Sequence, residues 1–109
     1  MSTSSTPEDG PQVVRNDERH EYEILVGEHV AGIAGYREEP GRILFTHTEI
    51  DPDFGGQGLG SVLAAAALDD AVERGLTIVP YCPFIQAYLR KHPDFSGEVS
   101  WPEEVVRPE

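Results

Sequence analysis

The sequence feature that most constrains the fold is a glycine-rich loop between a strand pattern at 42–50 and an alanine-rich helix pattern at 59–74. Four glycines fall within six residues, in the run Gly55-Gly56-Gln57-Gly58-Leu59-Gly60-Ser61. A helix that begins here presents unpaired backbone N–H groups and a partial positive charge. Because glycine has no Cβ, a phosphate can approach those amides closely. The spacing alone leaves two interpretations open, a site for a phosphorylated ligand or a plain tight turn.

The residues before the loop predict three antiparallel strands. Alternation over 21–26 places Tyr22, Ile24 and Val26 on one face of a half-buried strand. Gly27-Glu28 then forms a hairpin turn into a second strand at 30–36, whose two glycines weaken it or mark a bulge. Glu39-Pro40-Gly41 is a turn signal before the third strand at 42–50.

Strict alternation in that third strand predicts that Phe45, His47 and Glu49 share one face. Its opposite face would carry the four residues Leu44, Thr46, Thr48 and Ile50.

The residues after the loop predict a helix and a parallel strand. The helix at 59–74 is rich in alanine and has one apolar stripe, expected from Leu59, Val62, Leu63 and Ala66. A continuous apolar run at 76–81 follows, as in a buried strand parallel to the one before the helix. Pro80 cannot donate to a sheet ladder, so pairing should stop or splay near it.

The C-terminal part predicts a short helix and a last strand. Cys82-Pro83 is typical of a helix start, and we expect a helix at 84–92 and a strand at 95–101. The sum is an α+β domain with a mixed, mostly antiparallel sheet and a parallel β-loop-α-β core. We expect residues 1–12 to be disordered, 13–101 to form one domain, and 102–109 to be an acidic tail.

Composition excludes several classes of partner. The formal net charge of −12 argues against nucleic acid and against anionic membrane surfaces. The same charge favours cationic substrates such as amines or lysine-rich tails, or it serves solubility alone. One cysteine rules out an internal disulfide and suits a reducing cytosol, and the N-terminus lacks the basic and apolar parts of a signal peptide. We therefore expect a cytoplasmic protein, and a monomer or weak homodimer.

Three segments, taken together and in order, resemble the GNAT superfamily of acetyl-CoA-dependent N-acetyltransferases, and more narrowly its small, single-domain YjdJ-like branch. They are His47-Thr48-Glu49-Ile50, the glycine loop, and the stretch 79–93 with Cys82-Pro83-Phe84 and Tyr88. The resemblance covers roughly residues 12–101. It implies a minimal GNAT-like fold with a splayed strand pair, acetyl-CoA as co-substrate, no metal, and an amine acceptor that the sequence does not identify.

The resemblance also implies how the co-substrate is bound. Its diphosphate would lie on the amides of Gly56 to Ser61, and backbone around Ile50 would hold the pantetheine and polarise the thioester. In the superfamily pattern Arg/Gln-x-x-Gly-x-Gly/Ala, Gly58 and Gly60 match the small positions, whereas Gly55 replaces the leading Arg or Gln. Arg90 and Lys91 are the candidate cations for the 3′-phosphate; they also suit the end of a helix dipole.

A second departure from the superfamily concerns the acceptor. Larger members place helices between their first two strands, whereas here only Gly27-Glu28 joins them. The acceptor site should therefore be open and shallow, or be completed by a partner.

Three residues are candidates for proton transfer. Glu49 is the first choice as general base toward the amine, and His47 shares its predicted face as a relay. Tyr88 resembles the tyrosine that donates a proton to the coenzyme A sulfur in many relatives. The alternatives are a surface carboxylate, a packed or solvent-facing histidine, and a core aromatic residue.

Cys82 stands at a helix N-terminus, a position that lowers the pKa of a thiol. Either it carries the acetyl group covalently, or it lines the site while the amine attacks directly, or it only caps the helix.

At the level of the whole protein, the leading hypothesis is an N-acetyltransferase. A coenzyme A-binding module with little turnover is the alternative. A nucleotide-binding protein is disfavoured because the P-loop ending and the dinucleotide spacing are both missing.

Overall fold

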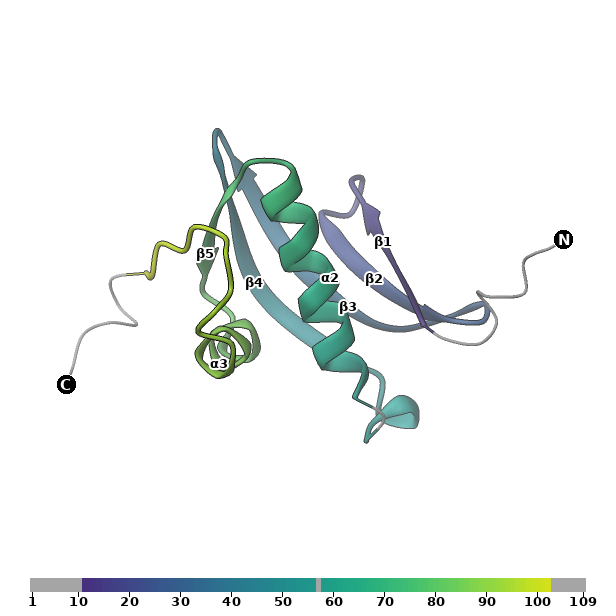
Figure 1. Cartoon of the computed structure of the whole chain (residues 1–109). Helices are drawn as coiled ribbons and strands as arrows, with labels where there is room; N and C mark the ends of the chain where they lie inside the picture. The colour runs from purple at the N-terminus through teal and green to yellow at the C-terminus, as the bar shows by residue number, and fades with distance from the viewer. Residues whose placement is uncertain (1–10, 57, 103–109) are drawn as a thin grey trace, which may run out of the picture.

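The computed structural model describes residues 11–56 and 58–102 and contains one five-stranded sheet with two α-helices on one face (Figure 1). The strands are β1 Gln12–Asn16, β2 Glu21–Val26, β3 His29–Glu39, β4 Arg42–Ile50 and β5 Thr77–Pro80. The helices are the 3₁₀ turn η2 Pro52–Phe54, α2 Leu59–Glu73 and α3 Pro83–Lys91. Sheet order follows chain order, with antiparallel pairs from β1 to β4 and a parallel β4–β5 pair. The predicted α+β class and mixed sheet are confirmed.

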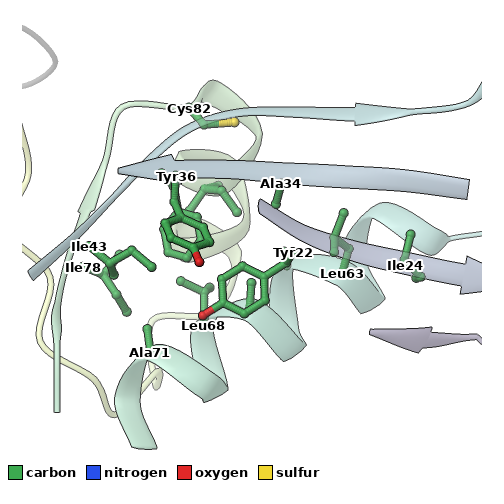
Figure 2. Packing of buried hydrophobic residues seen from close by; sticks show 14 of the residues in the cluster. Tyr22, Ile24, Ala34, Tyr36, Ile43, Leu63, Leu68, Ala71, Ile78 and Cys82 are labelled. Atoms are coloured by element: carbon green, nitrogen blue, oxygen red, sulfur yellow. The ribbon is translucent and has the colours of Figure 1, made fainter. Parts of the chain in front are cut away.

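The core lies between the sheet and the two helices (Figure 2). Tyr22, Tyr36 and Phe45 from three strands pack together, with ring centroids 5.3 and 6.1 Å apart for the two pairs that involve Tyr22. The helix α2 buries the stripe Leu59, Leu63, Ala64, Ala67, Leu68 and Ala71. The predicted stripe was wrong at Val62, which is 41% exposed, and at Ala66, which is only half-buried.

A β-bulge at Thr46 changes which side chains of β4 share a face. Gly35 pairs with His47 and Tyr36 pairs with Phe45, so Thr46 has no partner on β3. The extra residue shifts the alternation by one position. Phe45 therefore faces the helices together with Thr48, which pairs with the buried Ala34.

This register contradicts the predicted face of β4. His47 and Glu49 lie on the opposite face from Phe45 and do not share its side of the sheet. Strict alternation gave the wrong result because a bulge is set by the partner strand, where Gly35 leaves room for the His47 ring.

The first strand was not predicted from the sequence, so the expectation that Gly27-Glu28 joins the first two strands was wrong: residues 17–20 join them. β1 begins at Gln12, within the segment expected to be disordered, and is held to the sheet and to α2 by a polar network. The carboxylate of Asp70 accepts from the Tyr22 hydroxyl at 2.7 Å and from Arg15 at 2.6 Å. Burial, followed by the bond to Asp70, raises the pKa of Tyr22. Two side chains from different strands thus converge on one helix residue.

The C-terminal segment differs from its prediction as well. Instead of a strand at 95–101, the structure has a single parallel bridge between Ile78 and Val99. Gly97 packs against Phe95 and Val72 of α2, which holds the segment beside the helix layer. Residues 1–10 and 103–109, to which most of the expected disordered segment and acidic tail belong, lie outside the described residues.

The network predicts a stability effect at Asp70. Asp70→Ala removes the partner of the buried Tyr22 hydroxyl and should lower the free energy of unfolding by about 1–2 kcal/mol, measured by urea denaturation. The control is Asp69→Ala at the exposed neighbouring position, expected to change it by less than about 0.5 kcal/mol. Adding Tyr22→Phe to Asp70→Ala should cost nothing more, because no hydroxyl is then left unpaired; a further large loss would contradict the network.

Candidate functional site

The central feature of the site is the separation of β4 from β5. Their pairing ends at Phe45 and Pro80. The Phe45 carbonyl then accepts two hydrogen bonds, from the Tyr81 N–H at 3.0 Å and from the Cys82 N–H at 2.9 Å. The chain turns there into α3, while β4 continues to Ile50. On the side that β5 leaves, residues 46–50 of β4 have no strand partner within the described chain; we call this side the free edge of β4.

The direction of the backbone groups at Ile50 follows from its neighbours. The Asp51 N–H donates to the Ala31 carbonyl on β3 at 2.8 Å. Since C=O and N–H of a trans peptide point in opposite directions, the Ile50 carbonyl points away from β3. The Glu49 carbonyl lies against Gly32 on β3, so the Ile50 N–H also points away from β3. Ile50 therefore presents a donor and an acceptor at the free edge of β4.

The glycine loop ends in a helix start that no side chain caps. Gly56 and Gly58 have φ angles of +80° and +75°, a left-handed conformation that favours glycine. Gly58 is the N-cap of α2 and makes no side-chain cap hydrogen bond. The first N–H groups of α2 therefore have no intrahelical acceptor. Gln57, the remaining loop residue of the prediction, lies outside the described residues.

The position that departs from the superfamily pattern has ordinary geometry. Gly55 has φ −68° and ψ 155°, an extended conformation that any residue adopts. A Cβ there would have only the Pro52 carbonyl oxygen within 4 Å, at 3.4 Å. The backbone therefore does not require glycine at this position.

Helix α3 packs against the start of α2. The Phe84 ring lies over Gly60, where a Cβ would come within 2.7 Å of it. Beside this contact is a small hollow of about 70 Å³, lined by Ser61, Phe84, Ala87, Tyr88, Lys91 and His92. Tyr88 stacks on His92 with ring centroids 4.1 Å apart.

The two predicted phosphate cations have different surroundings. Lys91 lines the hollow next to Ser61. Arg90 instead lies over the Trp101 ring, 5.2 Å from its centroid. The structure therefore brings Lys91 close to the start of α2 and holds Arg90 in a separate cation–π contact.

Cys82 lies on the helix face of the sheet, beside the free edge of β4. It is the N-cap residue of α3 and is 2% exposed. Its Sγ is 3.2 Å from the Thr48 Oγ1, and either atom can be the donor. Sequence reasoning missed Thr48 as a site residue, because only the bulge turns it toward Cys82.

Glu49 and His47 lie on the opposite face, which we call the uncovered face because neither α2 nor α3 packs on it. Glu49 lines an open hollow of about 360 Å³ with Ile33, Ile50, Asp51 and Pro52 among its walls. The His47 ring lies over Gly35, and its Nδ1 is 3.2 Å from the Thr46 hydroxyl.

The four predicted catalytic residues are thus divided by the sheet. Glu49 and His47 lie on one side, and Cys82 and Tyr88 belong to the helix side. Because neighbouring residues of β4 point to opposite faces, Thr48 borders the free edge of β4 on the helix face and Glu49 borders it on the other face.

Two further carboxylates lie near His47 on the uncovered face. Burial, and then the adjacent Glu23 carboxyl, raises the pKa of Glu21. Glu23 accepts from the Asn16 amide at 3.1 Å. Neither glutamate was singled out from the sequence, although their two-residue spacing in a strand places them on one face.

A second region of the molecule, away from the candidate site, also has a hollow. A larger hollow of about 520 Å³ lies at the other end of α2, where Tyr36, Glu38 and Arg74 line it, and no predicted site residue borders it. Burial, and then the bond to Asp17, raises the pKa of Tyr36 there to about 12.

Within residues 11–56 and 58–102, no three His, Cys, Asp or Glu residues are grouped to hold a metal ion. None of the helices described here has both the length and the apolar character needed to cross a membrane.

Comparisons with known proteins indicate the family of this chain. A family model described as GCN5-related N-acetyl-transferase matches residues 21–99. Protein NATD1 of Mus musculus is 33% identical over 93 residues, which cover 83% of this chain and 84% of the mouse protein. Protein NATD1 of Gallus gallus is 33% identical over 84 residues, covering 75% of this chain and 76% of that protein.

A solved structure shares the fold. The ribosomal-protein-alanine N-acetyltransferase from Brucella melitensis biovar Abortus 2308 aligns with a TM-score of 0.52 and 19% identity, over 81% of this chain and 68% of that chain. Together with the family model, which spans most of the described sheet and both helices, these matches establish that the chain belongs to the GCN5-related N-acetyltransferase family.

Proposed function

We propose that this protein transfers an acetyl group from acetyl-CoA to an amine of a small molecule or protein. The observation that carries the proposal is the combination of a free edge of β4 at Ile50 with an uncapped start of α2. The first offers backbone groups to an extended chain such as pantetheine, and the second offers N–H groups to a diphosphate.

The residues present fit coenzyme A. At the left-handed Gly56 and Gly58, no atom beyond the adjoining residues lies within 4 Å of the place that a Cβ would take, so a diphosphate has room to approach the amides of Gly56 and of residues 58–61. Lys91 beside Ser61 is the stronger candidate for the 3′-phosphate, since Arg90 is held over Trp101. When bound, acetyl-CoA supplies an acyl group activated as a thioester.

The chain then has to polarise the acyl oxygen and manage two protons. The Ile50 N–H is a donor for that oxygen, a contribution of a few kcal/mol where such donors are preorganised. As the amine nitrogen bonds to the acyl carbon, its proton passes to Glu49. The carbon–sulfur bond breaks, and its electron pair leaves on the sulfur, to which Tyr88 is the candidate proton donor.

We assign Cys82 to the wall of this site and infer direct attack by the amine. The buried position of the thiol and its contact with Thr48 support a packed, hydrogen-bonded group. An acetyl-cysteine route would require the thiol to be freed from Thr48 and to meet the acceptor on the other face.

Binding is tested at Gly58. A Cβ at this left-handed position obstructs a diphosphate, so Gly58→Ala should weaken coenzyme A binding about tenfold, measured by isothermal titration calorimetry. The matched control is Gly41→Ala, since Gly41 has φ +78° and equally open surroundings in a turn between β3 and β4. Equal affinity of the two variants would contradict the loop assignment.

Catalysis is tested at Glu49 with a thiol-release assay over a panel of amines. Glu49→Gln should reduce kcat by about 10²–10⁴-fold at neutral pH, because the carboxylate no longer takes the amine proton. The deficit should narrow as the pH approaches the amine pKa near ~10, where the acceptor deprotonates by itself. Tight coenzyme A binding without thiol release from any amine would instead favour a binding module.

The route of the acetyl group is tested at Cys82. If the amine attacks directly, Cys82→Ala should retain turnover within about tenfold, whereas loss of an obligatory nucleophile costs on the order of 10⁴-fold or more. Cys82→Ser, which preserves a hydroxyl partner for Thr48, controls for packing. Detection of an acetylated Cys82 that disappears when amine is added would overturn direct attack.

A further inference from the structure

The uncovered face carries a row of three side chains across neighbouring strands. Glu23 on β2 pairs with Ile33 on β3, and Ile33 pairs with Glu49 on β4. Paired residues point to the same face of a sheet, so the three side chains stand side by side. With two strand spacings between them, the Cα atoms of Glu23 and Glu49 are about 10 Å apart.

The chemistry of this row is carboxylate, aliphatic, carboxylate. Ile33 is half-buried and forms part of the hollow that Glu49 and Ile50 also line. One end of the row is therefore the proposed general base beside the free edge of β4. The other end is a carboxylate with no assigned part in the reaction.

The adjacent row does not offer the same arrangement. There Glu21 pairs with Gly35 and Gly35 pairs with His47, whose ring fills the space above the glycine. Glu21 also has the Arg19 guanidinium 3.5 Å away, which offsets part of its charge. The row through Ile33 is thus the one that leaves an apolar strip accessible between two carboxylates.

We propose that the acceptor is a linear aliphatic diamine or polyamine that lies along this row. This rests on the proposed function, since Glu49 and the free edge of β4 define the reacting end. The alkyl chain covers Ile33, the reacting amine lies at Glu49, and a second ammonium group pairs with Glu23. The reacting nitrogen forms its bond to the acyl carbon and gives its proton to Glu49, while the carbon–sulfur bond breaks toward sulfur.

The separation between the carboxylates sets the selectivity. A monoamine reaches Glu49 and Ile33 but leaves Glu23 without a cationic partner, with only the Asn16 amide bonded to it. The protein's formal net charge of −12 attracts a dication more strongly than a monocation, so part of any preference for a diamine does not depend on Glu23. The part that depends on Glu23 is isolated by comparing two variants of equal net charge, one at Glu23 and one far from the row. Both parts should weaken with added salt, since the Debye length is about 10 Å at 0.1 M ionic strength.

The test compares kcat/KM for 1,4-diaminobutane and spermidine with kcat/KM for n-butylamine, using the full chain and acetyl-CoA. For the wild type, kcat/KM for the diamine divided by kcat/KM for n-butylamine should exceed about two, the statistical factor for two equivalent amino groups. This ratio should fall with added salt. Glu23→Gln should lower the ratio about fivefold, the size of one partly exposed charge pair. Glutamine still offers an oxygen to the Asn16 amide, so this variant should melt at a temperature close to that of the wild type.

The control is Glu73→Gln, which makes the same charge change at an exposed position on α2, on the other side of the sheet. It should leave the ratio unchanged. A wild-type ratio near two, or equal ratios for the two variants, would overturn the diamine assignment while leaving amine acetylation in place. Thiol release from none of the amines, with coenzyme A still bound, would overturn the proposed function itself.

Discussion

The site depends on how the Phe45 carbonyl is used. In a continuing parallel pair of strands, this oxygen would accept one hydrogen bond from the neighbouring strand. Here it accepts two, from the N–H groups of Tyr81 and Cys82, at the point where the chain leaves the sheet. Pro80 lacks an N–H and so cannot extend the pairing. The double acceptor fixes the start of α3 against β4, and with it the positions of Cys82 and Tyr88. Without these two hydrogen bonds, the start of α3 would not be held beside the free edge of β4.

The two faces of the sheet carry different groups of the candidate site. The helix face holds the glycine loop, Cys82 and the stacked Tyr88 and His92. The other face holds the carboxylates, with Glu49 nearest to the free edge of β4. Residues 17–20, which join the first two strands β1 and β2, form a turn and contain no helix that could cover that second face. The bulge at Thr46 is equally necessary, since it sends Thr48 to the first face and Glu49 to the second.

Much of the fold followed from local patterns. The alanine-rich helix, the Gly27-Glu28 hairpin and the strand at 42–50 were predicted nearly to the residue, because propensity, periodicity and turn residues agreed there. β1 was missed because its five residues carry no alternation strong enough to identify; Arg15 and the distant Asp70 hold it in place. The strand predicted at 95–101 was reduced to one bridge for a similar reason, since its partners lie on β5 and α2.

The candidate site was predictable in its residue types and less so in their placement. Glycine chemistry located the loop, but no local rule indicates a bulge opposite Gly35, and the faces of Phe45 and His47 came out wrong as a result. Thr48 and the row through Ile33 depend on strand register, which is a property of the assembled sheet. Whether Arg90 or Lys91 faces the start of α2 likewise depends on where Trp101 lies.

The ordinary backbone at Gly55 has an evolutionary consequence. Because the conformation there suits any amino acid and the surroundings leave room for a Cβ, a cationic side chain can be gained or lost by a single codon change without rebuilding the turn. Retention of the acyl carrier would then vary independently of folding. A substitution at this one position would then change how long the domain retains coenzyme A after acetyl transfer, and the rest of the domain would not have to change.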